Sequence, residues 1–152
     1  MKHLLGGLLL LSLSAFMPAS AAGQGSLPQT GRGRGAGLEL GQNYPNPVTS
    51  DTRIPFTIGD ASCSDPSRMY RVSLRIYNVV AQLVAVPVLQ GGTGNTAGGD
   101  RIDNVYLTCD KYIAYWDGSN LNTQQAVPGG VYLFRLEVDG KAVVKKMLVS
   151  KQ

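Results

Sequence analysis

Few side chains in this sequence have the type and spacing that catalysis or metal binding requires. Among its 152 residues there are one histidine, His3, and two cysteines, Cys63 and Cys109. His3 lies in a leader that we expect to be removed, so the mature chain has no histidine to act as a general base or zinc ligand. Two cysteines cannot form a four-cysteine metal site. We therefore expect no catalytic residues, no metal, no cofactor and no enzymatic activity.

Three aspartates, Asp100, Asp103 and Asp110, lie close together in the sequence. Loops rich in oxygen ligands can hold calcium, but this spacing does not match an EF-hand loop. A small hydrolase would also have to use these carboxylates, and no nucleophile or second acid can be paired with one of them from the sequence. Calcium binding and hydrolysis stay open as alternatives without a defined site.

Nucleotide and nucleic-acid binding are both disfavoured. Residues 92–97 fit the letters G-x-G-x-x-A of a dinucleotide-binding loop, which also requires a helix to begin there. Gly98-Gly99-Asp100 starts no helix, so we expect a surface loop. The net charge is +4, or +3 once Lys2 is removed with the leader, and so small an excess does not indicate a nucleic-acid partner.

The first 22 residues have the three-part plan of a secretory signal peptide. A short basic start precedes the apolar run Leu4–Phe16, and small residues follow it. Ala19 and Ala21 have the A-x-A spacing that predicts cleavage before Ala22, with Gly23 as the second choice. The alternative is an uncleaved membrane anchor, although the apolar run is short for a bilayer span.

Export to an oxidising compartment makes Cys63 and Cys109 a candidate disulfide. The bridge would close a loop of 47 residues, counting both cysteines, and would stabilise the fold by about 4 kcal/mol on the chain-entropy model. The alternative is a pair of separately buried thiols.

Beyond the leader, the sequence changes from linker to strand patterns. Residues 23–41 are rich in Gly with few large apolar residues, which predicts a flexible linker. Strict alternation of apolar residues in 71–77 and 131–138 indicates strands, and Asp139-Gly140 is typical of a two-residue hairpin turn. We expect strands over 52–58, 71–77, 83–89, 105–108, 112–116, 131–138 and 141–149.

About seven short strands in about 110 residues predict an all-β fold, an antiparallel β-sandwich of immunoglobulin-like type. Trp116 is expected in the core between the sheets, and Pro55 suggests that its strand lies at an edge or pairs irregularly. The predicted organisation is a signal peptide over 1–22, a linker over 23–41 and one domain over 42–152.

A set of short motifs then occurs in a fixed order, ending at the C-terminus. They are Gln42–Pro47, Thr52–Ile58, Val72–Tyr77, Trp116–Asn120, Val127–Leu136 and Lys145–Val149. With these motifs the chain resembles the C-terminal sorting domain of the type IX secretion system and the related immunoglobulin-like domain of the flagellar hook-capping protein. The match runs from about Gln42 to Lys151.

The resemblance implies that an outer-membrane translocon recognises the domain and that the chain is delivered to the cell surface or the medium. In that family such domains stand at the end of larger cargo proteins. Here only a 19-residue linker precedes the domain, so either the domain is itself the product or a cargo is missing. The positions that match the sorting motif are Gly130, Val131, Tyr132, Lys145, Lys146 and Met147.

The chain departs from the family pattern at several places. Ala81 stands where the family usually has glycine, and a glycine expected before Val127 is replaced within Thr123–Gln125. Two connections, 61–70 and 90–111, are longer than usual. Each holds one cysteine, so a disulfide would join the two insertions.

The motifs also allow interpretations that need no receptor. Gly129-Gly130 would let the chain enter a central strand where a Cβ would clash. Lys145, Lys146 and Lys151 would form a basic edge that either prevents non-specific strand pairing or presents positive charge to a partner. A second class of function is therefore a structural or adhesive immunoglobulin-like module that binds a surface partner through the insertions.

Overall fold

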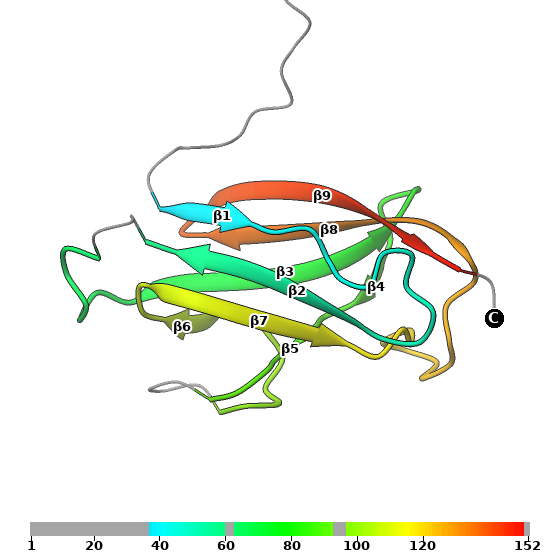
Figure 1. The fold of residues 1–152 in the computed structure, drawn as a ribbon, viewed down its shortest axis with the longest axis horizontal. Coiled ribbons are helices and arrows are strands. Elements are labelled where there is room, and N and C mark those ends of the chain that lie inside the picture. Colours follow the sequence, from blue (N-terminus) through cyan, green and yellow to red (C-terminus); the bar gives the residue numbers. More distant parts are fainter. Residues whose placement is uncertain (1–36, 60–62, 93–96, 151–152) are drawn as a thin grey trace, which may run out of the picture. The chain divides into compact units, whose positions relative to one another are not determined.

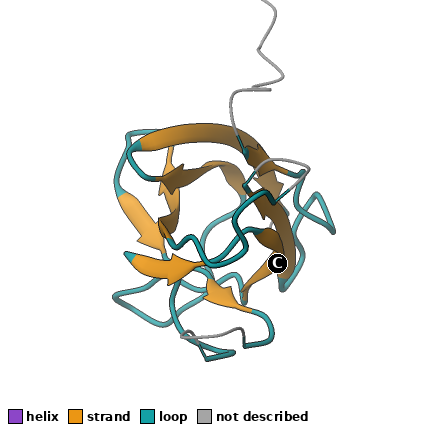
Figure 2. Ribbon diagram, turned by 90° about the vertical axis from the view of Figure 1, so that its left-hand side faces the viewer, coloured by secondary structure: helices purple, strands orange, loops and turns teal. Residues whose placement is uncertain are grey.

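A computed structural model describes residues 37–59, 63–92 and 97–150 of the chain. These residues form an all-β fold of antiparallel strands arranged as a β-sandwich (Figures 1 and 2). No helix within the three described ranges is long and apolar enough to cross a membrane. The strands are β1 (Leu38–Leu40), β2 (Thr52–Ile58), β3 (Tyr70–Asn78), β4 (Leu83–Ala85), β5 (Val88–Leu89), β6 (Val105–Leu107), β7 (Asp110–Trp116), β8 (Gly130–Val138) and β9 (Lys141–Val149).

The strands divide into two sheets. Sheet A has the order β1-β2-β7-β5, and sheet B has the order β4-β3-β8-β9 with β6 paired to the start of β3. The longest pairing joins β8 to β9, from Gly130 opposite Val149 to Val138 opposite Lys141. The two-residue turn between them has positive φ at both Asp139 (48°) and Gly140 (82°), as a type I′ hairpin requires.

The core lies between the sheets because each long strand alternates apolar and polar residues. In β2 the buried residues are Thr52, Ile54, Phe56 and Ile58, and in β3 they include Val72, Leu74 and Ile76. Trp116 of sheet A is 3% exposed, and its ring centroid lies 6.2 Å from that of Tyr132 in sheet B. Its Nε1 donates a hydrogen bond to the carbonyl of Ser119 at 2.9 Å, so the indole is both packed and hydrogen-bonded.

The prediction of a linker over 23–41 is wrong at the C-terminal end of that range. Leu38–Leu40 form β1, which pairs with β2 from Leu38 opposite Ile58 to Leu40 opposite Phe56. Leu38 and Leu40 are 7% and 3% exposed, so they belong to the core. The linker prediction relied on the average composition of the Gly-rich segment and overlooked Leu38 and Leu40, whose i, i+2 spacing is that of a strand.

The single strand expected over 83–89 is in fact two strands in different sheets. β4 pairs with β3 in sheet B, and β5 pairs with β7 in sheet A. Val86-Pro87 lies between them, and Pro87 has no N–H to continue a ladder. With β1, this division brings the number of strands in the described ranges to nine rather than about seven.

Pro55 does not mark an edge strand, because β2 lies between β1 and β7. The N–H of Arg53 donates to the carbonyl of Tyr44, and the carbonyl of Pro55 accepts from Gly41 at 2.7 Å. Gly41 lies opposite Pro55 in the β1–β2 register, and this pair makes only the bond from the Gly41 N–H because Pro55 has no N–H to return. The pairing is therefore irregular at this point, just past the end of β1.

Candidate functional site

The residues expected in the sorting motif lie on β8 and β9, at one edge of sheet B. Because adjacent residues of a strand point to opposite faces, the structure separates them. Tyr132 and Met147 point into the core and are 7% and 0% exposed. Val131 and Lys146 are exposed on the outer face of sheet B.

Two of these positions therefore support the fold rather than offering a side chain to a partner. Met147 is fully buried opposite Tyr132 in the β8–β9 pair. The phenol of Tyr132 donates a hydrogen bond to the carbonyl of Pro128 at 2.8 Å, and burial raises the pKa of Tyr132. The alternation of β9 contained this signal, because Met147 has the parity of the core-facing residues.

The clash expected at Gly130 is not observed. A Cβ built on Gly130 would meet no heavy atom within 4 Å. Gly130 begins β8, where the neighbouring residues Pro128 and Gly129 are exposed, so space does not explain a glycine there.

Lys145 and Lys146 lie on opposite faces of sheet B. Lys145 is half-buried on the inner side, opposite Phe134, and Lys146 is exposed on the outer side, opposite Leu133. An inward-pointing lysine on an edge strand is a known protection against strand pairing. Lys151 lies outside the described residues.

The outer edge of β9 is covered over its C-terminal half by the segment that precedes β2. The N–H of Leu148 donates to Asn46 Oδ1 at 3.0 Å, and its carbonyl accepts from the N–H of Val48 at 2.8 Å. Gln42 Nε2 donates to the carbonyl of Lys146 at 3.0 Å. Residues 42–48 and β9, which carry the first and last motifs of the resemblance, are therefore in direct contact.

An apolar stripe crosses the outer face of sheet B. Cross-strand pairs place Leu83 beside Tyr77, Tyr77 beside Leu133, and Val131 beside Leu148. The four aliphatic side chains are 36% to 44% exposed. We call these five residues the sheet B stripe; Lys146 lies beside it, opposite Leu133.

Sequence reasoning missed most of this stripe because it followed only the core-facing residues of β8. The remaining residues of an ordinary half-exposed strand are polar. Val131 and Leu133 are apolar on the outer face, whereas Arg135 and Glu137 further along the strand form an ion pair. Val144, paired with Arg135, is also 51% exposed on this face, so the stripe residues gather at one end of the sheet without being its only exposed apolar residues in the described ranges.

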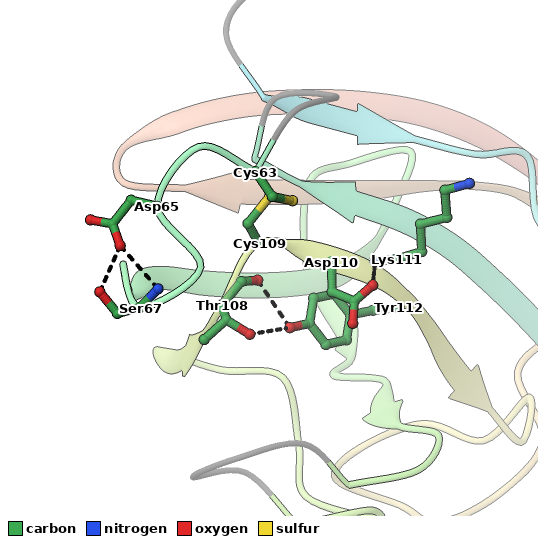
Figure 3. Close-up of a disulfide and its surroundings, with 8 residues drawn as sticks. All are labelled: Cys63, Asp65, Ser67, Thr108, Cys109, Asp110, Lys111 and Tyr112. Carbon is green, nitrogen blue, oxygen red and sulfur yellow. Dashed lines mark hydrogen bonds between the residues drawn. A yellow bond between two sulfur atoms is a disulfide. The ribbon is translucent and has the colours of Figure 1, made fainter.

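Cys63 and Cys109 form a disulfide with a Cα–Cα distance of 5.7 Å (Figure 3). The bridge joins the β2–β3 connection to the start of β7, and so links the two insertions. A Cβ on Gly59 would lie 2.1 Å from Cys109 Sγ, so the end of β2 packs directly on the bridge. Tyr112 donates a hydrogen bond to the carbonyl of Thr108 at 2.9 Å on the other side of Cys109.

The three aspartates of the second insertion do not converge. Asp103 forms an ion pair with Arg75. Asp100 accepts from the N–H of Ala97, and Asp110 accepts from the N–H of Lys111. Within residues 37–59, 63–92 and 97–150, no group of His, Cys, Asp or Glu side chains is placed to hold a metal ion. The predicted cleavage residues Ala19, Ala21 and Ala22 lie outside the described residues.

Comparison with known proteins gives one distant structural neighbour to report. No protein-family model matches the chain, and no curated protein matches it. A solved structure described as a beta-glucuronidase from glycoside hydrolase family 2 superposes with a TM-score of 0.42 at 16% sequence identity. The superposition covers 76% of this chain and 12% of the neighbour.

Proposed function

We propose that this chain is an exported, non-enzymatic β-sandwich that an outer-membrane secretion translocon recognises and delivers to the cell surface or the medium. The recognised surface is the sheet B stripe with Lys146 beside it. The observation that carries the proposal is this exposed apolar surface on the C-terminal strand pair, where the motifs that resemble type IX sorting domains lie.

The two glycine replacements support the resemblance. Ala81 has φ of 61°, and Gln124, within the second replacement, has φ of 57°. Both values belong to the left-handed region that glycine adopts without steric cost. The backbone here keeps the conformation for which a glycine is expected, although the side chains differ.

The exposed stripe supports recognition by a protein partner. Apolar residues that are contiguous on a surface and bordered by polar residues are typical of protein interaction sites. Lys146 adds a cation with no ion-pair partner among the described residues, and cations of this kind favour an acidic partner surface.

The test is export of a reporter inserted between Thr30 and Gly31 of the full chain, in a host that has the type IX system. We expect the reporter at the cell surface or in the medium. Leu133→Ser and Leu148→Ser, on the stripe, should leave it in the periplasm. The matched control is Ile113→Ser, because Ile113 and Leu133 are both 36% exposed but Ile113 lies on sheet A.

Retention of the unsubstituted fusion in the periplasm would contradict the sorting function. Equal export of the stripe variants and the control would show that another surface is recognised. Export that needs no translocon would favour the alternative, a structural or adhesive module that reaches the surface by another route.

A further inference from the structure

A row of tyrosine and arginine side chains crosses the outer face of sheet A, on the opposite side of the sandwich from the sheet B stripe. Pairing places Tyr44 beside Arg53, Arg53 beside Tyr115, Tyr115 beside Val88, and Val88 beside Arg101. Paired residues share a face, so all five side chains lie on one side. At the spacing of neighbouring strands the row is roughly 19 Å long.

The row is exposed at its two ends, half-buried between them and partly preorganised. Tyr44 is 47% exposed, and Arg101 is exposed at the other end of the row. The guanidinium of Arg53 lies 5.9 Å from the ring centroid of Tyr115 and forms an ion pair with Asp51 at 3.4 Å. These contacts restrict the Tyr115 side chain before any ligand binds.

The row ends in a pocket of about 140 Å³. Arg101, Tyr115, Asp117 and Gln124 line it, together with Val88. Asp117 accepts hydrogen bonds from the N–H and hydroxyl of Ser119 through one oxygen, Oδ1. Arg101 has no ion-pair partner within the ranges that the structure describes.

The geometry points to a carbohydrate-binding site, with an acidic polysaccharide as its ligand. A sugar ring presents an apolar C–H face that packs on an aromatic ring such as Tyr115. Its hydroxyl groups donate and accept hydrogen bonds, and the pocket offers a donor in Arg101, an acceptor in Asp117 and both in Gln124. A sugar carboxylate matches the planar donor pair of Arg101.

Other ligand classes fit this surface less well. The row has no contiguous aliphatic patch for a lipid or an amphipathic helix, since Val88 is its one aliphatic residue and an arginine lies on either side of the Tyr115–Val88 pair. A long polymer of repeating rings suits a row that crosses several strands and ends in a small pocket. The carbohydrate site is independent of the proposed export function, because the two surfaces lie on different sheets.

The test is affinity electrophoresis of the purified full chain in gels that contain alginate, a carboxylated polysaccharide, or dextran, a neutral one, at about 0.15 M salt to screen non-specific attraction. We expect retardation by alginate and little by dextran. Arg101→Gln and Tyr115→Ala should each weaken alginate binding about tenfold. The matched control is Arg71→Gln, which removes an exposed arginine from sheet B and should leave binding unchanged.

Absence of retardation by alginate would overturn the site. Equal weakening by Arg71→Gln and Arg101→Gln would also overturn it, because binding would then follow net charge alone. Equal retardation by dextran would overturn the acidic class of ligand. Thermal unfolding of each variant checks that it is folded. If Tyr115→Ala does not fold, Arg101→Gln still tests the site, because Arg101 is exposed and its substitution should not disturb the core.

Discussion

The outer faces of the two sheets differ although they cover the same core. On sheet B, the exposed residues at one end are aliphatic, with Leu133 and Leu148 beside Lys146. On sheet A, two tyrosines, two arginines and Val88 form a row that ends in a pocket with polar and apolar lining. The inner faces of both sheets are mainly apolar, with Thr52 on sheet A and Lys145 on sheet B as polar residues among them.

The core-facing and the outward-facing residues of a strand are therefore under different physical requirements. Residues of one parity in each strand satisfy the requirement of a dry interior. Residues of the other parity do not have to fill a dry interior. Function is therefore expected on the outer faces, at the sheet B stripe and at the row on sheet A. Substitutions of the two parities should then have separate effects.

The largest effect is expected from removing the disulfide, which links the connection between the sheets to the start of β7. Cys63→Ser with Cys109→Ser should lower the free energy of unfolding by about 4 kcal/mol, because the bridge closes a long loop. Urea unfolding measures it, with the reduced unsubstituted chain as control. If hydrogen exchange showed that the variant loses amide protection in one sheet only, the two sheets would be separately folding units.

A smaller effect separates the inner from the outer face of β9. Met147→Ala should cost about 3 kcal/mol, because Met147 is fully buried and a cavity replaces it. Lys146→Ala, one residue earlier on the exposed side, should change stability by less than about 0.5 kcal/mol. Both are measured by urea unfolding. Similar costs for the two variants would contradict the assignment of the faces.

A stabilising change is expected beside the sheet B stripe, in the β3–β4 turn. Ala81 has φ of 61°, so Ala81→Gly should raise the free energy of unfolding by about 1 kcal/mol through relief of steric cost. Ala142→Gly, in the extended and exposed part of β9, should instead lower it by about 0.5 kcal/mol. Thermal unfolding distinguishes them, and a loss of stability in Ala81→Gly would refute the left-handed backbone.

The smallest effect concerns Asp117, in the pocket at the end of the sheet A row. The hydroxyl of Ser119 donates to Asp117 and holds the pKa of its carboxyl below the ordinary value of 3.8. The stabilisation is therefore present above pH 3.8 and is lost as the pH falls through the lowered pKa of the folded state.

Ser119→Ala should reduce this dependence on pH. Its stability should fall relative to the unsubstituted chain at about pH 6, and the difference should shrink at a second pH below 3.8, as the folded carboxyl takes up its proton. Unfolding by urea at the two pH values measures the difference. An equal loss at both would mean that the hydroxyl acts on the loop and not on the charge.

Much of the fold could be predicted from local patterns. The alternation of Val72, Leu74 and Ile76 and the Asp139-Gly140 pair lead directly to β3 and the β8–β9 hairpin. β1 and the division of 83–89 could not be predicted in this way. Two short apolar segments become strands only because a neighbouring strand offers free backbone groups to pair with.

The candidate sites were less predictable than the fold. The sorting motif marked β8 and β9 but grouped buried Met147 with exposed Lys146. The row on sheet A combines Tyr44, Arg53, Tyr115 and Arg101, which are far apart in the sequence. Their juxtaposition depends on the pairing register of five separate segments, because Arg101 joins the row through Val88 of β5, and no local pattern contains it.

Local residue patterns are sufficient for the all-β class, the alternation of apolar residues in each long strand and the hairpin turn, because these depend on neighbours a few residues away. The separation of the three aspartates, the sheet that each half of 83–89 joins and the exposed side chains that become adjacent depend on the tertiary structure. The physical reason is that strand pairing brings together residues from distant segments, and the order and register of those strands are set by the packing of the whole core.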